Sequence, residues 1–162
     1  MSAVRVWKSV GIAAAAATTA AALGIVLTDL GPWYYALRQP SWKPPDYLFG
    51  PAWTLIFILA AMSGVIGWWS STDRRFRRWM IVLFVTNIAL NSWWSYLFFI
   101  ARRPDWALAE VGYLWLSIVA LIWLLWRRSH GAAWLLVPYA VWVSFAASIN
   151  WGVVRLNGPF GG

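Results

Sequence analysis

Residues 48–70 read LFGPAWTLIFILAAMSGVIGWWS, a run without a charged side chain that is long enough to cross a lipid bilayer as a helix. Comparable apolar runs lie on either side of it. The sequence predicts five transmembrane helices, at residues 6–28, 48–70, 76–100, 106–126 and 132–154. Continuous apolar runs favour helices over a transmembrane barrel, whose strands alternate apolar and polar residues. We therefore expect an all-α integral membrane bundle that forms a single domain over residues 1–162.

The composition agrees with a lipid environment. The chain has 162 residues, of which 62% are hydrophobic and 11% charged, whereas a soluble domain carries roughly a quarter charged residues. It has no cysteine, which excludes disulfides and thiolate metal sites. The formal charge of +8 comes from basic residues in short clusters between the apolar runs. This pattern is typical of anchors at an anionic lipid surface, so we expect the lipid bilayer, and not nucleic acid, as the partner.

The first apolar run allows two interpretations. Arg5 and Lys8 precede a stretch rich in alanine and threonine, which is also the pattern of a cleaved signal peptide. The run reaches Leu27, however, and this length favours a retained helix. Five spans place the termini on opposite sides, and the basic residues divide eight to five in favour of the N-terminal side. The sequence therefore predicts a cytoplasmic N-terminus and an outside C-terminus.

The loop at residues 29–47 is the longest connection between predicted helices. Loops of this length often serve as lids or binding segments. Its prolines stiffen the backbone and reduce the entropy lost when the loop is ordered. We expect it to cover one mouth of the bundle as a lid; for Trp33 and Tyr34, an interfacial aromatic belt is an equally supported alternative. The prolines and aromatic residues of the loop are Pro32, Trp33, Tyr34, Tyr35, Pro40, Trp42, Pro44, Pro45 and Tyr47.

Three motifs carry a resemblance to a known family. The first is Trp33-Tyr34-x-x-Leu37-x-x-Pro40-Ser41-Trp42-x-Pro44-Pro45-x-x-x-Phe49-Gly50-Pro51-x-Trp53. The second is Ala89-Leu90-Asn91-x-x-Trp94-x-x-x-Phe98-Phe99, and the third is Pro138-Tyr139-x-x-Trp142-x-x-Phe145-Ala146-x-x-x-Asn150. In order, spacing and the five-span frame they resemble the TspO/MBR family of tryptophan-rich sensory proteins and translocator proteins.

The resemblance implies a five-helix bundle that binds tetrapyrroles such as protoporphyrin IX and haem. It also implies sterols and benzodiazepine-type drugs as further ligands, a homodimer, and a bacterial membrane as host. Some relatives act as stress-linked regulators of pigment synthesis, some degrade porphyrin in light, and transport has been proposed. The expected function is therefore a membrane receptor or regulator of tetrapyrroles. A porphyrin-degrading enzyme, or a facilitative transporter of porphyrin or sterol-like ligands, is the alternative.

The residues that we expect to contact the ligand are mostly aromatic. Flat, rigid side chains suit a large planar ligand, although the same residues can pack helices together. The resemblance favours ligand contact for Trp53 and Trp142, and Asn91 is the better candidate for the cavity floor. Pro138 should kink the last helix. The predicted ligand-binding residues are Trp33, Tyr34, Trp42, Pro44, Pro45, Phe49, Trp53, Asn91, Trp94, Trp142, Phe145, Ala146 and Asn150.

The sequence contains no conventional catalytic constellation. His130, the only histidine, falls in a short predicted loop, and the chain lacks a cysteine that could ligate haem iron. We therefore expect no metal site and no obligatory cofactor, with porphyrin or haem held as a ligand by stacking. Glu110 is the one carboxylate clearly within a predicted span, too few for a proton-coupled pump. If the protein is an enzyme, Trp53 and Trp142 are the candidate electron donors.

Overall fold

The computed structural model describes residues 3–160; residues 1, 2, 161 and 162 of the expected domain lie outside the described range. The described chain is all-helical, with no strand between residues 3 and 160. Its elements are α1 (Ala3–Leu27), α2 (Pro32–Ala36), the 3₁₀ turn η1 (Asp46–Leu48), α3 (Phe49–Trp69), α4 (Arg74–Ser95), the π-helical turn η2 (Tyr96–Ile100), α5 (Pro104–Trp126), α6 (His130–Trp134) and α7 (Val137–Asn157).

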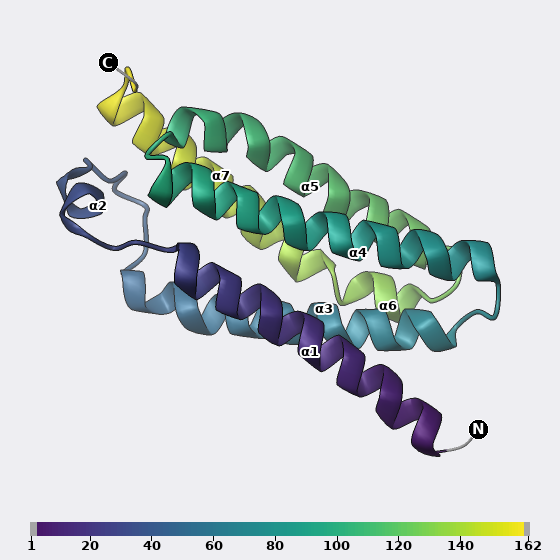
Figure 1. The fold of residues 1–162 in the computed structure, drawn as a ribbon. Coiled ribbons are helices and arrows are strands. Elements are labelled where there is room, and N and C mark those ends of the chain that lie inside the picture. The colour runs from purple at the N-terminus through teal and green to yellow at the C-terminus, as the bar shows by residue number, and fades with distance from the viewer. Residues whose placement is uncertain (1–2, 161–162) are drawn as a thin grey trace.

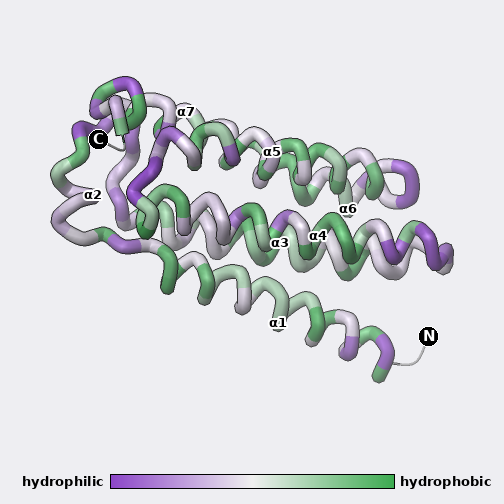
Figure 2. Tube along the Cα trace, turned by 45° about the horizontal axis from the view of Figure 1, so that its top comes forward, coloured by the Kyte–Doolittle hydropathy of each residue, from purple (hydrophilic) through white to green (hydrophobic). Residues whose placement is uncertain are grey.

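Five helical segments of the described chain are long and apolar enough to span a membrane, which confirms the predicted fold class. They extend beyond the predicted spans at several ends, most clearly where the last segment runs from His130 to Asn157. Figure 2 shows the physical reason for the arrangement. Hydrophilic residues gather at the ends of the bundle and in the loop around α2, and hydrophobic residues follow the lengths of the helices.

The helices lie roughly alongside one another, and the two termini lie at opposite ends of the bundle (Figure 1). α1 packs against α3 and α4, and α5 packs between α4 and α7. α3 packs mainly on α1 and α6, and its contact with α7 is small. The loop around α2 and the C-terminus share one end of the bundle, and the N-terminus shares the other with the turn between α3 and α4.

α5 carries the core of the bundle. Its buried residues recur every three or four positions and so form one continuous stripe along the helix. Five of them, Pro104, Ala107, Ile118, Leu121 and Leu125, are fully buried. Gly67 of α3 lies against this stripe, since a Cβ atom at Gly67 would stand 2.5 Å from Leu125 Cδ2. The glycine therefore permits a close approach between α3 and α5. In lipid, helices associate through such close packing, because the hydrophobic effect does not drive them together.

Pro138 interrupts the last membrane segment as predicted, but as a full break and not as a bend. The segment divides into α6 and α7 at Leu135 and Leu136, and Pro138 lies in the first turn of α7, where a helix needs no amide donor. The Ser63 hydroxyl on α3 donates a hydrogen bond of 2.7 Å to the Ala132 carbonyl oxygen of α6. This bond satisfies a backbone acceptor beside the break and attaches α3 to α6.

The connection between α4 and α5 is tightly wound. The Ala101 amide donates to the Tyr96 carbonyl oxygen over 2.8 Å, which closes the wide π-helical turn. Arg102 follows in the left-handed region, with φ of 55°, which is uncommon for a side chain of this kind. Its guanidinium lies over the Trp33 ring, with Cζ 5.7 Å from the ring centroid. The turn thereby presents a cation to the first loop.

Candidate functional site

A small cavity lies inside the bundle between α3, α4, α5 and α7. Its volume is about 10 Å³, close to the least that holds one water molecule. Four predicted ligand-binding residues line it, together with three aliphatic side chains that were not predicted as ligand-binding residues. The lining residues are Trp53, Asn91, Trp94, Val111, Leu114, Val143 and Ala146.

Aromatic rings gather where α3 faces α7. The Trp53 ring stacks on Phe57, with centroids 5.4 Å apart, and meets the Trp142 ring edge-on at 6.4 Å. Trp142 in turn contacts Phe49 at 5.6 Å and Phe145 at 5.8 Å. The structure thus brings together the aromatic residues that were predicted on these two helices.

The indole N–H of Trp142 is buried and has no hydrogen-bond partner among residues 3–160. A buried donor without a partner costs on the order of 1–3 kcal/mol, so native proteins rarely leave one unpaired. Trp142 adjoins Trp53, which lines the cavity. An acceptor atom on a ligand would therefore relieve this cost.

A polar network crosses the bundle beneath the aromatic cluster. The Tyr139 hydroxyl donates to Asn87 Oδ1 over 3.1 Å, and the Asn91 amide donates to the Tyr139 hydroxyl over 3.4 Å. Asn87 also donates to the Ser117 hydroxyl over 2.9 Å. Asn87 therefore joins α4 to α5 and α7. Asn91 both takes part in the network and lines the cavity.

Asn150 holds three helices together. With its amide in the orientation that satisfies both of its polar atoms, Nδ2 donates to the Pro104 carbonyl oxygen over 3.0 Å. Oδ1 then accepts hydrogen bonds from Trp94 Nε1 at 3.3 Å and from the Leu108 amide at 3.1 Å. Asn150 does not line the cavity, and it fixes the indole of Trp94, which does. Its predicted contact with a ligand stays a prediction.

Trp33 and Tyr34 pack on the turn that follows α4. The Trp33 ring meets Phe98 edge-on at 6.3 Å, and the Tyr34 ring lies 5.7 Å from Phe99. The buried Tyr34 hydroxyl donates to the Asp46 carboxylate over 2.6 Å. Burial and this hydrogen bond raise the pKa of the Tyr34 phenol far above its usual value. The two rings hold the loop to the protein and do not line the cavity.

The rest of the loop is seated on α7. Gly152 is buried, and a Cβ atom there would lie 2.8 Å from Pro40 Cβ and 3.1 Å from Trp42 Cζ2. Trp42 keeps 46% of its surface exposed, Pro44 is half-buried and Pro45 is exposed. Sequence reasoning missed Gly152, although a glycine inside a helix is a known signal of close backbone approach.

A second attachment joins the loop to the end of α7. The Arg38 amide donates to Asn157 Oδ1 over 2.8 Å, and Asn157 Nδ2 donates to the Arg38 carbonyl oxygen over 2.9 Å. Lys43 also pairs with Asp46 within the loop. The loop is therefore fixed at several points across the end of the bundle. No sequence signal pointed to Asn157.

Glu110 is the buried carboxylate of the bundle. It lies on α5 with 7% of its surface exposed, and neither carboxylate oxygen has a hydrogen-bond partner in the described part of the chain. His130, by contrast, is exposed at the start of α6, with its ring centroid 4.5 Å from that of Trp126. Glu110 is adjacent in sequence to the cavity residue Val111.

Known proteins resemble this chain over most of its length. The sequence profile of the TspO/MBR family matches residues 6–156. The tryptophan-rich protein TspO of Chlorobaculum tepidum is 40% identical over 129 residues, which cover 77% of this chain and 80% of that protein. Protein CrtK of Rhodobacter capsulatus is 32% identical over 142 residues, which cover 88% of each chain. The translocator protein of Homo sapiens is 31% identical over 128 residues, 77% of this chain and 75% of that protein.

Proposed function

This chain belongs to the TspO/MBR family, and we propose that it is a membrane receptor or regulator that binds tetrapyrroles such as protoporphyrin IX and haem between Trp53 and Trp142. The observation that carries the proposal is the buried, unpartnered indole N–H of Trp142, beside the cavity residue Trp53. A carboxylate or carbonyl oxygen on a ligand would accept this hydrogen bond, and the flat indoles would stack on its ring system.

A tetrapyrrole requires the cavity to widen. Binding sites for ligands of this size enclose roughly 300–1,000 Å³, whereas the cavity now encloses about 10 Å³. The boundary between α3 and α7 is the place where widening costs least, since these helices meet through Phe49, Trp53 and Trp142 and otherwise contact one another little. Asn91 and Ala146 would then form the floor of the site.

In this proposal the loop is a lid over the widened site. Trp42, Pro44 and Pro45 lie between Pro40, which packs against α7, and η1, which directly precedes α3. A lid attached to both helices would follow their separation and cover the ligand. Sterols and benzodiazepine-type drugs are further ligands of the same proposed site, and a homodimer is the proposed assembly.

The proposed orientation places the N-terminus in the cytoplasm of a bacterium. The turn between α3 and α4 shares the end of the bundle with the N-terminus. The arginines that begin α4, Arg74, Arg75, Arg77 and Arg78, therefore lie on that side and follow the excess of basic residues on cytoplasmic loops. Fusion of a reporter that is active only in the cytoplasm to each terminus tests this orientation.

Quenching of tryptophan fluorescence by protoporphyrin IX tests the site. We expect Trp142→Phe to weaken binding about fivefold, since it removes one hydrogen-bond donor worth about 1 kcal/mol and keeps an aromatic ring. Trp126→Phe is the matched control, because Trp126 is the last residue of α5, lies beside His130 and does not line the cavity. Equal affinities for the wild type and the Trp142→Phe variant would count against the proposed site.

The contact between Trp53 and Trp142 also favours a second candidate function, the oxidative degradation of bound porphyrin. Two indoles whose centroids lie 6.4 Å apart would both touch a ring bound between them and could donate electrons to it. Illumination in air of the purified protein with protoporphyrin IX, followed at the Soret band, separates the two functions. Products that disappear in a Trp53→Phe, Trp142→Phe double variant support the enzyme, and an unchanged spectrum supports the receptor.

A further inference from the structure

A second and much larger hollow lies outside the bundle, between the start of α4 and the end of α5. It is an open groove of about 520 Å³ at the end of the molecule that holds the N-terminus. We propose that it binds an anionic phospholipid, with the phosphate among the arginines and the acyl chains along the apolar part of the groove. The lining residues are Asp73, Arg75, Phe76, Trp79, Leu83, Ala120, Trp123, Leu124, Arg127 and Arg128.

The charge of the groove selects an anion. Three guanidinium groups face one carboxylate among the described lining residues, which leaves an excess of two positive charges. Arg127 is held in place by Trp123, with its Cζ 3.9 Å from the ring centroid. Neither Arg75 nor Arg127 forms an ion pair with an acidic side chain of residues 3–160. Guanidinium groups bind phosphate through paired N–H donors, so two of them are available for a headgroup.

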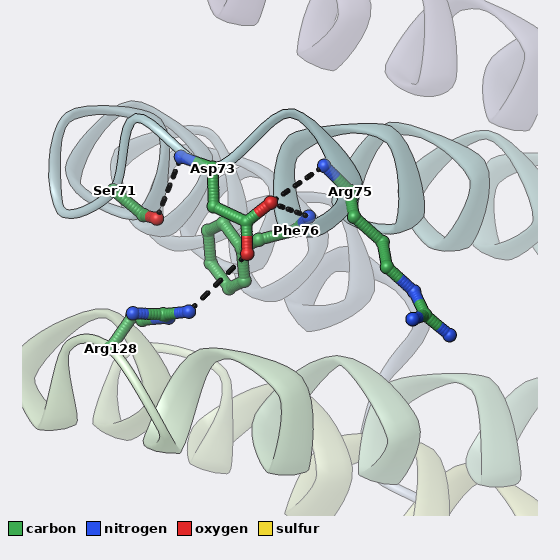
Figure 3. A network of polar contacts seen from close by, with 5 residues as sticks. All are labelled: Ser71, Asp73, Arg75, Phe76 and Arg128. Carbon is green, nitrogen blue, oxygen red and sulfur yellow. Dashed lines mark hydrogen bonds and ion pairs between the residues drawn. The ribbon is translucent and has the colours of Figure 1, made fainter.

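Asp73 organises the rim of the groove and leaves it basic. Its carboxylate caps α4 by accepting hydrogen bonds from the Arg75 amide at 2.8 Å and the Phe76 amide at 3.4 Å (Figure 3). Its second oxygen pairs with Nη2 of Arg128, in the turn that follows α5, over 3.3 Å. The amides of Arg75 and Phe76 are thus already satisfied, and in this proposal the arginine side chains hold the anion.

The depth of the groove distinguishes a lipid from a soluble anion. Leu83 lies eight residues beyond Arg75 on α4, and Ala120 lies seven residues before Arg127 on α5. At 1.5 Å per residue the groove extends roughly 10–12 Å from its charged rim into the apolar part of the bundle. Trp79 and Trp123 occupy the level between, where tryptophan lies at the membrane interface. This order of charge, aromatic belt and apolar wall matches a phospholipid.

Charge also disfavours a second copy of the chain as the occupant. In a two-fold symmetric dimer formed through this groove, each groove would face its own copy. The arginines Arg75, Arg127 and Arg128 would then approach their equivalents, with one Asp73 on each side to balance them. Like charges across an interface are costly, so an anionic lipid fits the groove better.

Native mass spectrometry of the full chain released from detergent micelles tests the proposal. The probes are phosphatidylglycerol, phosphatidylcholine with the same acyl chains, and inorganic phosphate. We expect the wild type to retain phosphatidylglycerol about tenfold more than phosphatidylcholine, and inorganic phosphate not to displace the lipid at equal concentration. Equal retention of the two lipids, or displacement by inorganic phosphate, would overturn the proposal.

Two sets of variants locate the lipid. Arg75→Gln with Arg127→Gln should abolish the tenfold preference, whereas Arg74→Gln with Arg78→Gln should keep it, since Arg74 and Arg78 are exposed on α4 outside the groove. An equal loss in both pairs would show a general surface attraction and refute a defined site. Thermal melting of each variant establishes that it is folded.

Ala120→Leu tests the apolar part of the groove at unchanged charge. The larger side chain should reduce retention of phosphatidylglycerol severalfold, because it occupies the space assigned to an acyl chain. Unchanged retention of phosphatidylglycerol would show that the headgroup alone is bound and would overturn this part of the proposal. The arginine pair Arg75→Gln, Arg127→Gln should also leave the mass of the assembly unchanged; conversion of a dimer into a monomer would assign the groove to a second copy instead.

Discussion

The side-chain amide of Asn157 bonds both backbone polar groups of Arg38, which lies 119 residues earlier in the chain. The two bonds, of 2.8 and 2.9 Å, join the first loop to the last turn of α7. The side-chain amide pairs with the backbone N–H and C=O of Arg38 as a backbone residue does in a β-ladder. They give the loop a fixed position relative to α7 that does not depend on the aromatic contacts of Trp33 and Tyr34.

Asn157→Ala should release this end of the loop. Removal of the two exposed hydrogen bonds to Arg38, together with the bond from Asn157 to the Val153 carbonyl oxygen, should cost about 1 kcal/mol and lower the melting temperature by roughly 3 °C. Differential scanning fluorimetry measures the shift, and limited proteolysis at residues 29–47 reports the loop itself. Unchanged proteolysis would show that Asn157 does not hold the loop.

Gly152→Ala should lift the loop from α7. The new Cβ atom would stand 2.8 Å from Pro40 Cβ, a distance that two carbon atoms do not share without movement. We expect faster hydrogen exchange at the Lys43 amide, which is bonded to the Pro40 carbonyl oxygen at 3.1 Å. Gly112→Ala is the control: apart from its chain neighbours and the backbone of its own helix, no atom of residues 3–160 lies within 4 Å of a Cβ at that position, so the change should stabilise α5 by about 0.5–1 kcal/mol.

The loop should loosen at high pH through Tyr34. An unfolded tyrosine loses its proton near pH 10, whereas the folded protein keeps Tyr34 protonated because its pKa is raised. Above about pH 10 the folded state therefore binds more protons than the unfolded state, and stability falls as the pH rises. Proteolysis of the loop between pH 9 and pH 11, a range set by that ordinary pKa, should accelerate in the wild type and in Tyr35→Phe but be level in Tyr34→Phe. A rise that persists in Tyr34→Phe would contradict this account.

Glu110→Met should stabilise the bundle in the absence of ligand. A buried carboxylate without a partner is costly in an apolar interior, and methionine fills a similar volume without a polar group. We expect the melting temperature to rise by about 2–4 °C, which corresponds to roughly 1 kcal/mol in a chain of this size. A lower melting temperature would show that Glu110 has a partner in the folded protein.

Ser63→Ala should weaken the contact between α3 and α6. The change leaves the Ala132 carbonyl oxygen buried without a donor, at a cost of about 1–3 kcal/mol. Ser70→Ala is the control, because the Ser70 hydroxyl, at the C-cap of α3, makes a local bond to the Gly67 carbonyl oxygen of the same helix. Comparable losses of stability in the two variants would mean that the bond between the helices contributes nothing beyond a local one.

The features that the sequence predicted well depend on local patterns. Hydropathy alone locates five membrane helices, since each requires a long apolar run. Pro138 signals the interruption of the last segment, because proline has no amide to donate. The family motifs predicted Trp53, Asn91, Trp94 and Ala146, which the fold brings to one cavity.

What the sequence could not predict depends on contacts between distant residues. The seat of Pro40 on Gly152 and the bonds between Arg38 and Asn157 exist only once α7 lies under the loop. The basic clusters were expected to be lipid anchors, but the convergence of Arg75 and Arg127 on one groove requires α4 and α5 to be antiparallel neighbours. Neither relationship leaves a periodicity in the sequence.

The attachment of α3 at Ser63 has a mechanical consequence. Ser63 and the tightly packed Gly67 hold the second half of α3 to α6 and α5, whereas the first half meets α7 through the aromatic contact between Trp53 and Trp142. We therefore expect α3 to pivot near Ser63, so that its first half moves away from α7 while its second half stays in place. A guest molecule should enter sideways beneath the loop, and spin labels on Gly50 and Val141 should separate on its arrival while labels on Ile66 and Ile122 keep their distance.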